Sequence, residues 1–228
     1  MSETRELVNY ELRGDVALLN FDDGKANVIS PDSTAALNSA LDRAEKEAKA
    51  LVIAGRAGRF SAGFDLSVMK QGGAAVVEMI SGGAALVSRL YGFPVPTVAA
   101  VTGHALAMGA VLLMSIDERI AAQGAFKIGL NEAAIGMSLP TFALILARDR
   151  LTPSHLIRAT ANAEIYAPEA AVDAGFVDRV VDAERVVDEA VARAQELSAL
   201  DTGSHHAIKS ALRAEALAAL RESIGEVR

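Results

Sequence analysis

The chain contains no cysteine and no tryptophan among its 228 residues, and aromatic residues of all kinds make up only 4% of it. The lack of cysteine excludes disulfides and every mechanism that uses a thiol nucleophile. Hydrophobic residues reach 51% and are almost all aliphatic, which favours closely packed helices and strands over an aromatic-rich binding surface. A chain of this length buries about 70–75% of its unfolded surface. We therefore predict one domain, or one domain with a helical appendage.

Positive charge is also scarce. The 22 basic and 29 acidic residues give a net charge of −7, which argues against nucleic acid as a partner but leaves room for a phosphorylated ligand at a local basic patch. Residues 1–6 are polar and lack the apolar core of a signal sequence. The longest apolar runs are too short to span a membrane. These features predict a cytoplasmic protein without a membrane partner.

Hydrophobic periodicity predicts an α/β fold in which strands and helices recur as strand, strand, helix. The N-terminal part alternates like a hairpin with a turn at Gly14-Asp15, and Ser30-Pro31 is typical of a helix start. From Pro140 onward the pattern is mostly helical, and two amphipathic helices close the chain. The expected strands are 7–13, 16–21, 51–54, 96–101, 116–121, 125–130 and 177–181, and one periodic segment, 76–90, is interrupted by Gly82-Gly83.

Two strand-to-helix turns have the composition of an oxyanion-binding site. The strand at 51–54 leads to Phe60-Ser-Ala-Gly-Phe-Asp-Leu66, and the strand at 96–101 leads through Thr102–Ala110 into an apolar helix. The first N–H groups of a helix have no intrahelical partner and carry partial positive charge, and small residues let a ligand approach them closely. Each turn alone is an ordinary loop. Together they predict two N–H donors that polarise one oxygen.

Three motifs in register resemble the crotonase family, the enoyl-CoA hydratases and isomerases. They are Ser-Ala-Gly-Phe-Asp-Leu at 61–66, Gly-His-Ala-Leu-Ala-Met-Gly at 103–109 and Asn-Glu-Ala-Ala-Ile-Gly at 131–136, and the likeness runs from about residue 7 to the end. The resemblance implies a crotonase-type spiral of repeated ββα units that carries an acyl-CoA site.

The resemblance also implies a division of the chain. The spiral core covers residues 1–182, and residues 183–228 form a C-terminal helical region that assembles the protein into a homotrimer or a dimer of trimers. Because the chain ends earlier than family members usually do, the resemblance predicts a shortened last helix.

The family assigns the chemistry to backbone amides and glutamates. Carried over, the oxyanion donors are the N–H groups of Phe64 and Met108, where the family usually has glycine in place of Met108. The two glutamates of family hydratases correspond to Val111 and Glu132. Valine cannot activate water, so Glu132 is left as the single acid/base, as in the family's isomerases. The alternative for Glu132 is a solvated carboxylate that caps a helix, but its apolar neighbours favour partial burial and a raised pKa.

The substrate contacts predicted by the resemblance lie around these turns, and each has a structural alternative. Lys25 is equally well explained as a solvated loop lysine and Asp65 as a helix cap. His104, within the glycine turn, is expected to hydrogen-bond backbone carbonyls across that turn. Basic side chains at 56, 59 and 70 are weak candidates for the phosphates of coenzyme A. The predicted contacts are Lys25, Ala26, Val28, Ala62, Asp65, Leu66, Gly109 and Val111. No metal site is predicted, and coenzyme A enters as part of the substrate, so no separate cofactor is expected.

The resulting prediction is isomerisation of an enoyl-CoA double bond in fatty acid metabolism. Three alternatives stay open: an enoyl-CoA hydratase of low efficiency, an acyl-CoA thioester hydrolase, and an acyl-CoA binding protein that has lost catalysis. The segment Gly136-Met-Ser-Leu-Pro140 resembles half of a serine-hydrolase elbow, but proline replaces its closing glycine.

Overall fold

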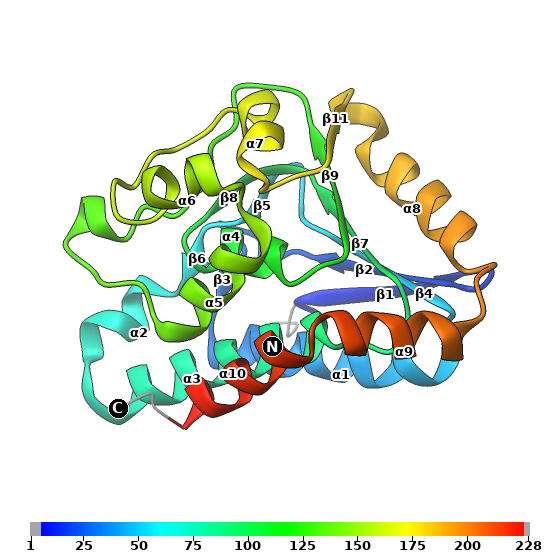
Figure 1. Ribbon diagram of the computed structural model, residues 1–228, viewed down its shortest axis with the longest axis horizontal. Coiled ribbons are helices and arrows are strands. Elements are labelled where there is room, and N and C mark those ends of the chain that lie inside the picture. Colours follow the sequence, from blue (N-terminus) through cyan, green and yellow to red (C-terminus); the bar gives the residue numbers. More distant parts are fainter. Residues whose placement is uncertain (1–5, 226–228) are drawn as a thin grey trace, which may run out of the picture.

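The computed structural model describes residues 6–225, and the predictions for residues 1–5 and 226–228 lie outside this range. A six-stranded sheet with the order β1-β2-β4-β7-β9-β11 forms the main layer (Figure 1). Its strands are β1 Val8–Arg13, β2 Val16–Phe21, β4 Ala50–Ala54, β7 Thr97–Val101, β9 Glu118–Ala122 and β11 Arg179–Val181. The hairpin is confirmed, because β1 and β2 pair antiparallel and Gly14 adopts a φ of +62° in the turn. The other pairs are parallel.

Two small sheets accompany the main one. One has the order β10-β8-β5 and contains β5 Gly58–Ser61, β8 Gly103–Leu106 and β10 Ile128–Gly129, and the other pairs β3 Val28–Ile29 with β6 Gly63–Phe64. Successive chain segments therefore place a first strand in the main sheet and a second in a small sheet before a helix follows, as the ββα prediction requires. The expected strand at 125–130 is wrong in extent, because only two of its residues are in β-structure.

The helices before residue 182 cover the sheets on one side. They are α1 Pro31–Glu47, α2 Leu66–Gln71, α3 Gly73–Tyr91, α4 Met108–Met114, α5 Thr141–Arg150, α6 Pro153–Ala159 and α7 Pro168–Ala174, with a 3₁₀ turn, η1, at Ala133–Ile135. The cap predicted for α1 is present, since the amide of Ser33 donates to Ser30 Oγ at 3.2 Å. α3 continues through Gly82-Gly83 without a break.

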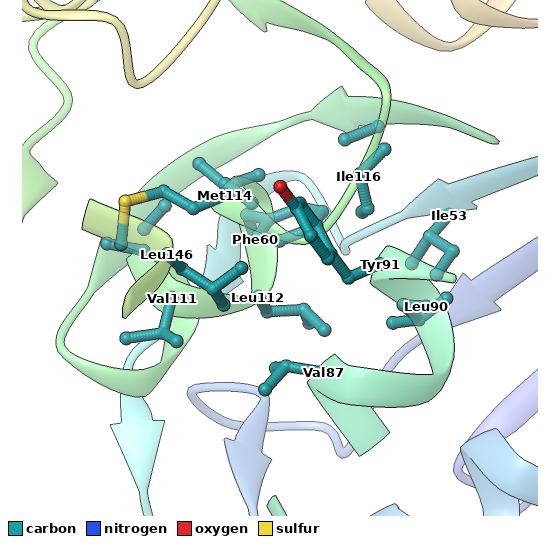
Figure 2. Packing of buried hydrophobic residues seen from close by; sticks show 14 of the residues in the cluster. Ile53, Phe60, Val87, Leu90, Tyr91, Val111, Leu112, Met114, Ile116 and Leu146 are labelled. Atoms are coloured by element: carbon teal, nitrogen blue, oxygen red, sulfur yellow. The ribbon is translucent and has the colours of Figure 1, made fainter. Parts of the chain in front are cut away.

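The core lies on both faces of the main sheet because strand side chains alternate. In β4, Leu51 and Ile53 belong to the large cluster shared with α1, α3, α4 and α5. The alternate residues Ala50, Val52 and Ala54 belong to a second cluster on the opposite face of the sheet. Figure 2 shows the centre of the large cluster, where α4 residues such as Leu112 meet side chains from α3, α5, β4 and β5. All of α4 is buried, which fixes its first turn firmly.

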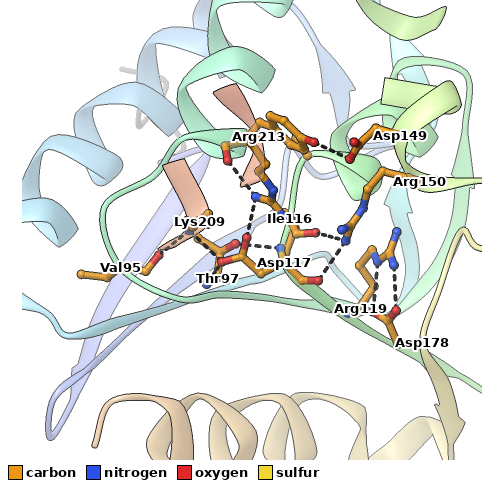
Figure 3. A network of polar contacts seen from close by, with 12 residues as sticks. Val95, Thr97, Ile116, Asp117, Arg119, Asp149, Arg150, Asp178, Lys209 and Arg213 are labelled. Atoms are coloured by element: carbon orange, nitrogen blue, oxygen red, sulfur yellow. Dashed lines mark hydrogen bonds and ion pairs between the residues drawn. The ribbon is translucent and has the colours of Figure 1, made fainter. Parts of the chain in front are cut away.

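The C-terminal region shares this core. It comprises a 3₁₀ turn, η2, at Ala183–Arg185 and the helices α8 Val186–Leu197, α9 Thr202–Leu212 and α10 Ala214–Ile224. α8 covers the second face of the main sheet, and α10 packs against α3 and α5 (Figure 1). Charged side chains of α9 and of the turn before α10 reach Asp117, just before β9, in a buried polar network (Figure 3).

Helix α3 is long and apolar enough to cross a membrane by length and composition, with a mean hydropathy of 1.3. The expectation that no apolar segment reaches that length therefore missed this helix. Core helices satisfy the same criterion, and α3 buries a face that includes Met79, Leu86 and Leu90 against α1, α4 and α10.

Candidate active site

The small sheet β10-β8-β5 brings the three predicted motifs to one place. β8 lies in its middle and pairs parallel with β5 and with β10, in registers that set Ala105 beside both Ser61 and Ile128. Parallel strands end at the same edge of a sheet, so the turns that follow them must lie side by side. These turns carry Phe64, Met108 and Glu132.

The turns after β5 and β8 meet at their backbones. Gly63, at a φ of +95°, approaches so closely that a Cβ added to it would lie 3.1 Å from the amide nitrogen of Met108. The amide of Asp65 donates to Ile29 O at 3.1 Å. Because successive strand amides point to opposite sides, the N–H of Phe64 points away from β3. Met108 begins α4, so its N–H is one of the groups without an intrahelical partner.

Ala107 sets the direction of the Met108 amide. It adopts a φ of +51°, which is rare for a residue with a side chain, and its own amide donates to Gly129 O at 3.0 Å. Such backbone conformations cost about 1–3 kcal/mol and persist where the surrounding structure enforces them. Here the pairing of β8 and β10 and the buried helix α4 hold the strained residue from both sides.

Glu132 is buried, with 7% of its surface exposed, at the start of η1. Its side chain makes no capping hydrogen bond, and within the described chain its Oε2 atom and Oδ1 of Asn131 are buried without a hydrogen-bond partner. Burial raises the pKa of Glu132 above the usual 4.5. The interpretation as a solvated cap is therefore wrong, because the carboxyl faces the pocket.

The three turns enclose an apolar pocket of about 150 Å³. Phe64, Met108, Val111 and Glu132 all line it, and Glu132 is the one carboxylate among its described lining residues. Of the predicted substrate contacts, Ala62 and Leu66 lie here as well. The sequence analysis did not predict substrate contacts at the remaining lining residues, which are Met69, Ile80, Ala107, Asn131, Ile135, Met137, Ser138, Pro140, Phe142 and Ala143.

Several predicted contacts lie elsewhere. Lys25 lines a second, open cavity of about 380 Å³ together with His104, Arg56 and Arg59. Arg56 and Arg59 are two of the three basic groups suggested for the coenzyme A phosphates, and the third, Lys70, does not line this cavity. The loop of Lys25 is held by Arg56, whose Nη1 donates to Lys25 O at 2.8 Å. Gly109 does not line the pocket and packs on β5, where an added Cβ would lie 2.3 Å from Ser61 O.

The other predicted contacts take part in hydrogen bonds that hold the backbone of their loops and cap a helix. Ala26 O accepts from the Ala62 amide at 3.0 Å, and the Val28 amide donates to Asp23. Asp65 caps α2 by accepting from the Ser67 amide at 2.7 Å, which confirms its structural interpretation. His104 Nδ1 accepts from the backbone amide of Lys127 at 3.0 Å, so its partner at this nitrogen is a backbone amide and not the predicted carbonyl.

One structural residue of the site was missed by sequence reasoning. Asn27 is fully buried at a φ of +53°, and its Nδ2 donates to Phe21 O at 2.7 Å and to Phe60 O at 3.2 Å. It thereby fastens the loop of Lys25 to β5. Asparagine tolerates positive φ better than most residues, but nothing else in the sequence marks this position.

A family model described as enoyl-CoA hydratase/isomerase matches residues 11–225 of this chain. The chain belongs to this family, the crotonase family. Membership accounts for the ββα arrangement described above as the crotonase fold, and it identifies acyl-CoA thioesters as the class of substrate on which the family acts.

Solved and curated members of the crotonase family include both hydratases and isomerases. One structure of a Mycobacterium tuberculosis protein, described as an enoyl-CoA isomerase, is 41% identical, with a TM-score of 0.94 over 97% of each chain. Another structure of the same protein is described as a probable enoyl-CoA hydratase. A putative enoyl-CoA hydratase of Thermus thermophilus is 30% identical over 82% of this chain and 76% of its own length. A peroxisomal enoyl-CoA delta isomerase of Arabidopsis thaliana is 28% identical over 75% of this chain and 76% of its own.

Proposed function

We propose that this protein isomerises 3-enoyl-CoA to 2-enoyl-CoA with Glu132 as its single acid/base. The observation that carries the proposal is the pocket itself, which is lined by Phe64, Met108, Val111 and the buried carboxyl of Glu132, whose Oε2 atom has no hydrogen-bond partner among the described residues. By the resemblance to the family, Val111 corresponds to the second hydratase glutamate. The similarity to the enoyl-CoA delta isomerase of Arabidopsis thaliana supports the proposal.

The chemistry follows from the charges that develop. The thioester oxygen accepts hydrogen bonds from the amides of Phe64 and Met108. The Glu132 carboxylate removes a proton from C2, the electrons of that C–H bond pass toward the carbonyl, and the two amides stabilise the dienolate oxygen. Glu132 then returns the proton at C4, and the double bond moves to C2–C3. One oxyanion donor of this kind is typically worth about 3–4 kcal/mol.

Replacement of the acid/base tests the proposal. Glu132→Gln should lower isomerisation of 3-enoyl-CoA by about 10²–10⁴-fold, the usual contribution of a general acid–base group, while acyl-CoA binding persists. The exposed Glu78→Gln serves as the matched control. Rates are followed by the absorbance of the conjugated 2-enoyl thioester.

A hydratase is the second candidate, because the Thermus thermophilus relative is named as one. Rapid hydration of 2-enoyl-CoA with no isomerisation of 3-enoyl-CoA would replace our proposal with this candidate. Tight acyl-CoA binding without either activity would indicate the binding protein. Val111→Glu restores the missing acid, and a gain of hydration would support the carried-over alignment.

We further propose that the cavity of Lys25, Arg56 and Arg59 receives the phosphates of coenzyme A.

We also propose that the protein assembles as a trimer or a dimer of trimers. Helix α9 exposes Ile208 and Leu212 by 62% and 81%, which is more apolar surface than a solvated helix needs. Sedimentation equilibrium distinguishes a trimer or hexamer from a monomer, and a monomeric result would overturn the assembly.

A further inference from the structure

The acyl pocket ends at helix α3, and the side chains that end it belong to the two residues whose amides form the oxyanion site. Ile80 of α3 lines the pocket, and Gly83 follows it by three residues, on the same face of the helix. A Cβ added to Gly83 would lie 2.7 Å from Cε1 of Phe64 and 3.2 Å from Cε of Met108. The phenyl ring and the thioether therefore fill the space directly in front of Gly83.

The neighbouring Gly82 shows that only the face of α3 that carries Gly83 lies this close to the side chains of Phe64 and Met108. A Cβ on Gly82 would meet only Thr34 of α1, at an ordinary 3.6 Å. Gly83 is buried, and Met108 is 1% exposed. The missing side chain at 83 thus provides the room that the ends of Phe64 and Met108 occupy.

We propose that Met108 is a specificity-determining residue, whose side chain shortens the acyl pocket and restricts the protein to short-chain acyl-CoA. The cavity of about 150 Å³ is comparable to one that holds a benzene ring, which corresponds to an acyl group of about six carbons. This inference rests on the proposed function for the position of the thioester. It gives the Met108 side chain a task separate from that of its amide.

Two substitutions change the pocket in opposite directions. Met108→Ala keeps the backbone amide but removes the Cγ, Sδ and Cε atoms, so the pocket lengthens toward Gly83. Gly83→Ala adds a methyl group that displaces the ends of Phe64 and Met108 toward the pocket, so it shortens. Alanine is also favoured over glycine within a helix, which offsets part of the cost of this closer packing. Met114→Ala, at an equally buried position of α4 outside the pocket lining, is the matched control.

The readout is the binding of saturated acyl-CoAs from four to sixteen carbons, measured by calorimetry. We expect the unchanged protein to bind hexanoyl-CoA at least about tenfold more tightly than dodecanoyl-CoA. A tenfold difference in Kd corresponds to about 1.4 kcal/mol of binding free energy. Met108→Ala should abolish this preference, Gly83→Ala should increase it, and Met114→Ala should leave it unchanged. Equal binding of both thioesters by the unchanged protein, or equal effects of Met108→Ala and Met114→Ala, would overturn the proposal.

Saturated thioesters need no proton transfer, so this series is independent of the isomerase reaction. Absence of isomerisation with an intact chain-length preference would overturn the proposed function alone. Isomerisation that proceeds equally well on six- and twelve-carbon substrates would overturn the role of Met108 alone.

Discussion

At the scale of single residues, Glu132 combines the catalytic role that we propose for it with an energetic cost. Its carboxyl is buried, and the Oε2 atom has no partner in the described chain. Burial disfavours the charged form and raises the pKa of Glu132. A raised pKa brings a carboxylate closer to the strength of base that removes a proton at neutral pH.

Because the Glu132 carboxyl is buried, we expect the stability of the protein to depend on pH. Because the pKa of Glu132 is higher in the folded than in the unfolded state, folding binds a proton, and stability falls as pH rises from the unfolded pKa through the folded one. Glu132→Gln removes that loss. We expect the variant to be more stable than the unchanged protein near neutral pH, because glutamine fills the same place without an ionisable group, by about 1.4 kcal/mol for each pH unit by which folding raises the pKa of Glu132, with no difference at a pH below both pKa values.

Urea unfolding at several pH values measures this difference. The exposed Glu78→Gln should change stability by no more than about 0.5 kcal/mol at any pH, as is usual for surface substitutions. A Glu132→Gln variant that is less stable at neutral pH would show that the carboxylate makes stabilising contacts. The same shift predicts that isomerase activity falls as pH drops through the raised pKa of Glu132, because only the carboxylate removes a proton.

The sequence predicted the burial of Glu132 from four apolar neighbours, and only one of them is part of the core. Leu130 is fully buried, whereas the other neighbours, Ala133, Ala134 and Ile135, are exposed, and Ile135 by 54%. The carboxyl is buried because β10 pairs with β8 and places the following turn against Met108. Neither this long-range pairing nor the hydrogen bonds that Asn27 makes to distant backbone groups can be predicted from the pattern of neighbouring residues.

At the scale of elements, the sequence predicted most of the strands of the main sheet and the two strand-to-helix turns that carry Phe64 and Met108. The β1–β2 hairpin and the start of α1 follow from alternation and from the Ser30-Pro31 cap. The two-residue strands β3, β6 and β10 are too short to give a periodic signal. They exist because parallel pairing with β8 or with one another satisfies their backbone groups, and they are the strands that position the site.

The contact between β5 and α4 shows how glycine makes this positioning possible. Gly109 lies so close to Ser61 that any side chain would collide with its carbonyl oxygen. Its resemblance-based assignment as a substrate contact differs from its place in the structure, where it allows α4 to begin directly over β5. The motif Gly103–Gly109 therefore combines a packing requirement with an amide donor, and a sequence pattern cannot separate the two.

At the scale of the whole molecule, the C-terminal helices are joined to the sheet through Asp117. Its Oδ2 lies 2.8 Å from Lys209 Nζ and its Oδ1 lies 2.7 Å from Arg213 Nη1, while the amide of Thr97 donates to Oδ2 at 2.9 Å (Figure 3). The side chains of Asp117 and Lys209 are 15% and 7% exposed. The network ties residues more than 90 positions apart in the chain, which no local pattern reveals.

Burial alone would raise the pKa of Asp117, but the charges of Lys209 and Arg213 and the Thr97 amide outweigh it and hold the pKa below its usual 3.8. A lowered pKa means that the carboxylate stabilises the fold above the unfolded pKa, and that this contribution is lost as pH falls through the folded pKa. Asp117→Asn leaves the buried Lys209 without its counter-charge, and removal of one partner from a buried pair typically costs about 3–5 kcal/mol.

We therefore expect Asp117→Asn to lower the free energy of unfolding by that amount near neutral pH, and the difference from the unchanged protein to shrink in acid. Asp15→Asn breaks the exposed pair with Lys49 and should cost no more than about 1 kcal/mol. Urea unfolding followed by circular dichroism compares the three proteins. Equal losses for both variants would mean that the network does not stabilise the docking of α9 and α10. A large loss for Asp117→Asn alone would show that the C-terminal helices depend on one buried carboxylate for their place in the fold.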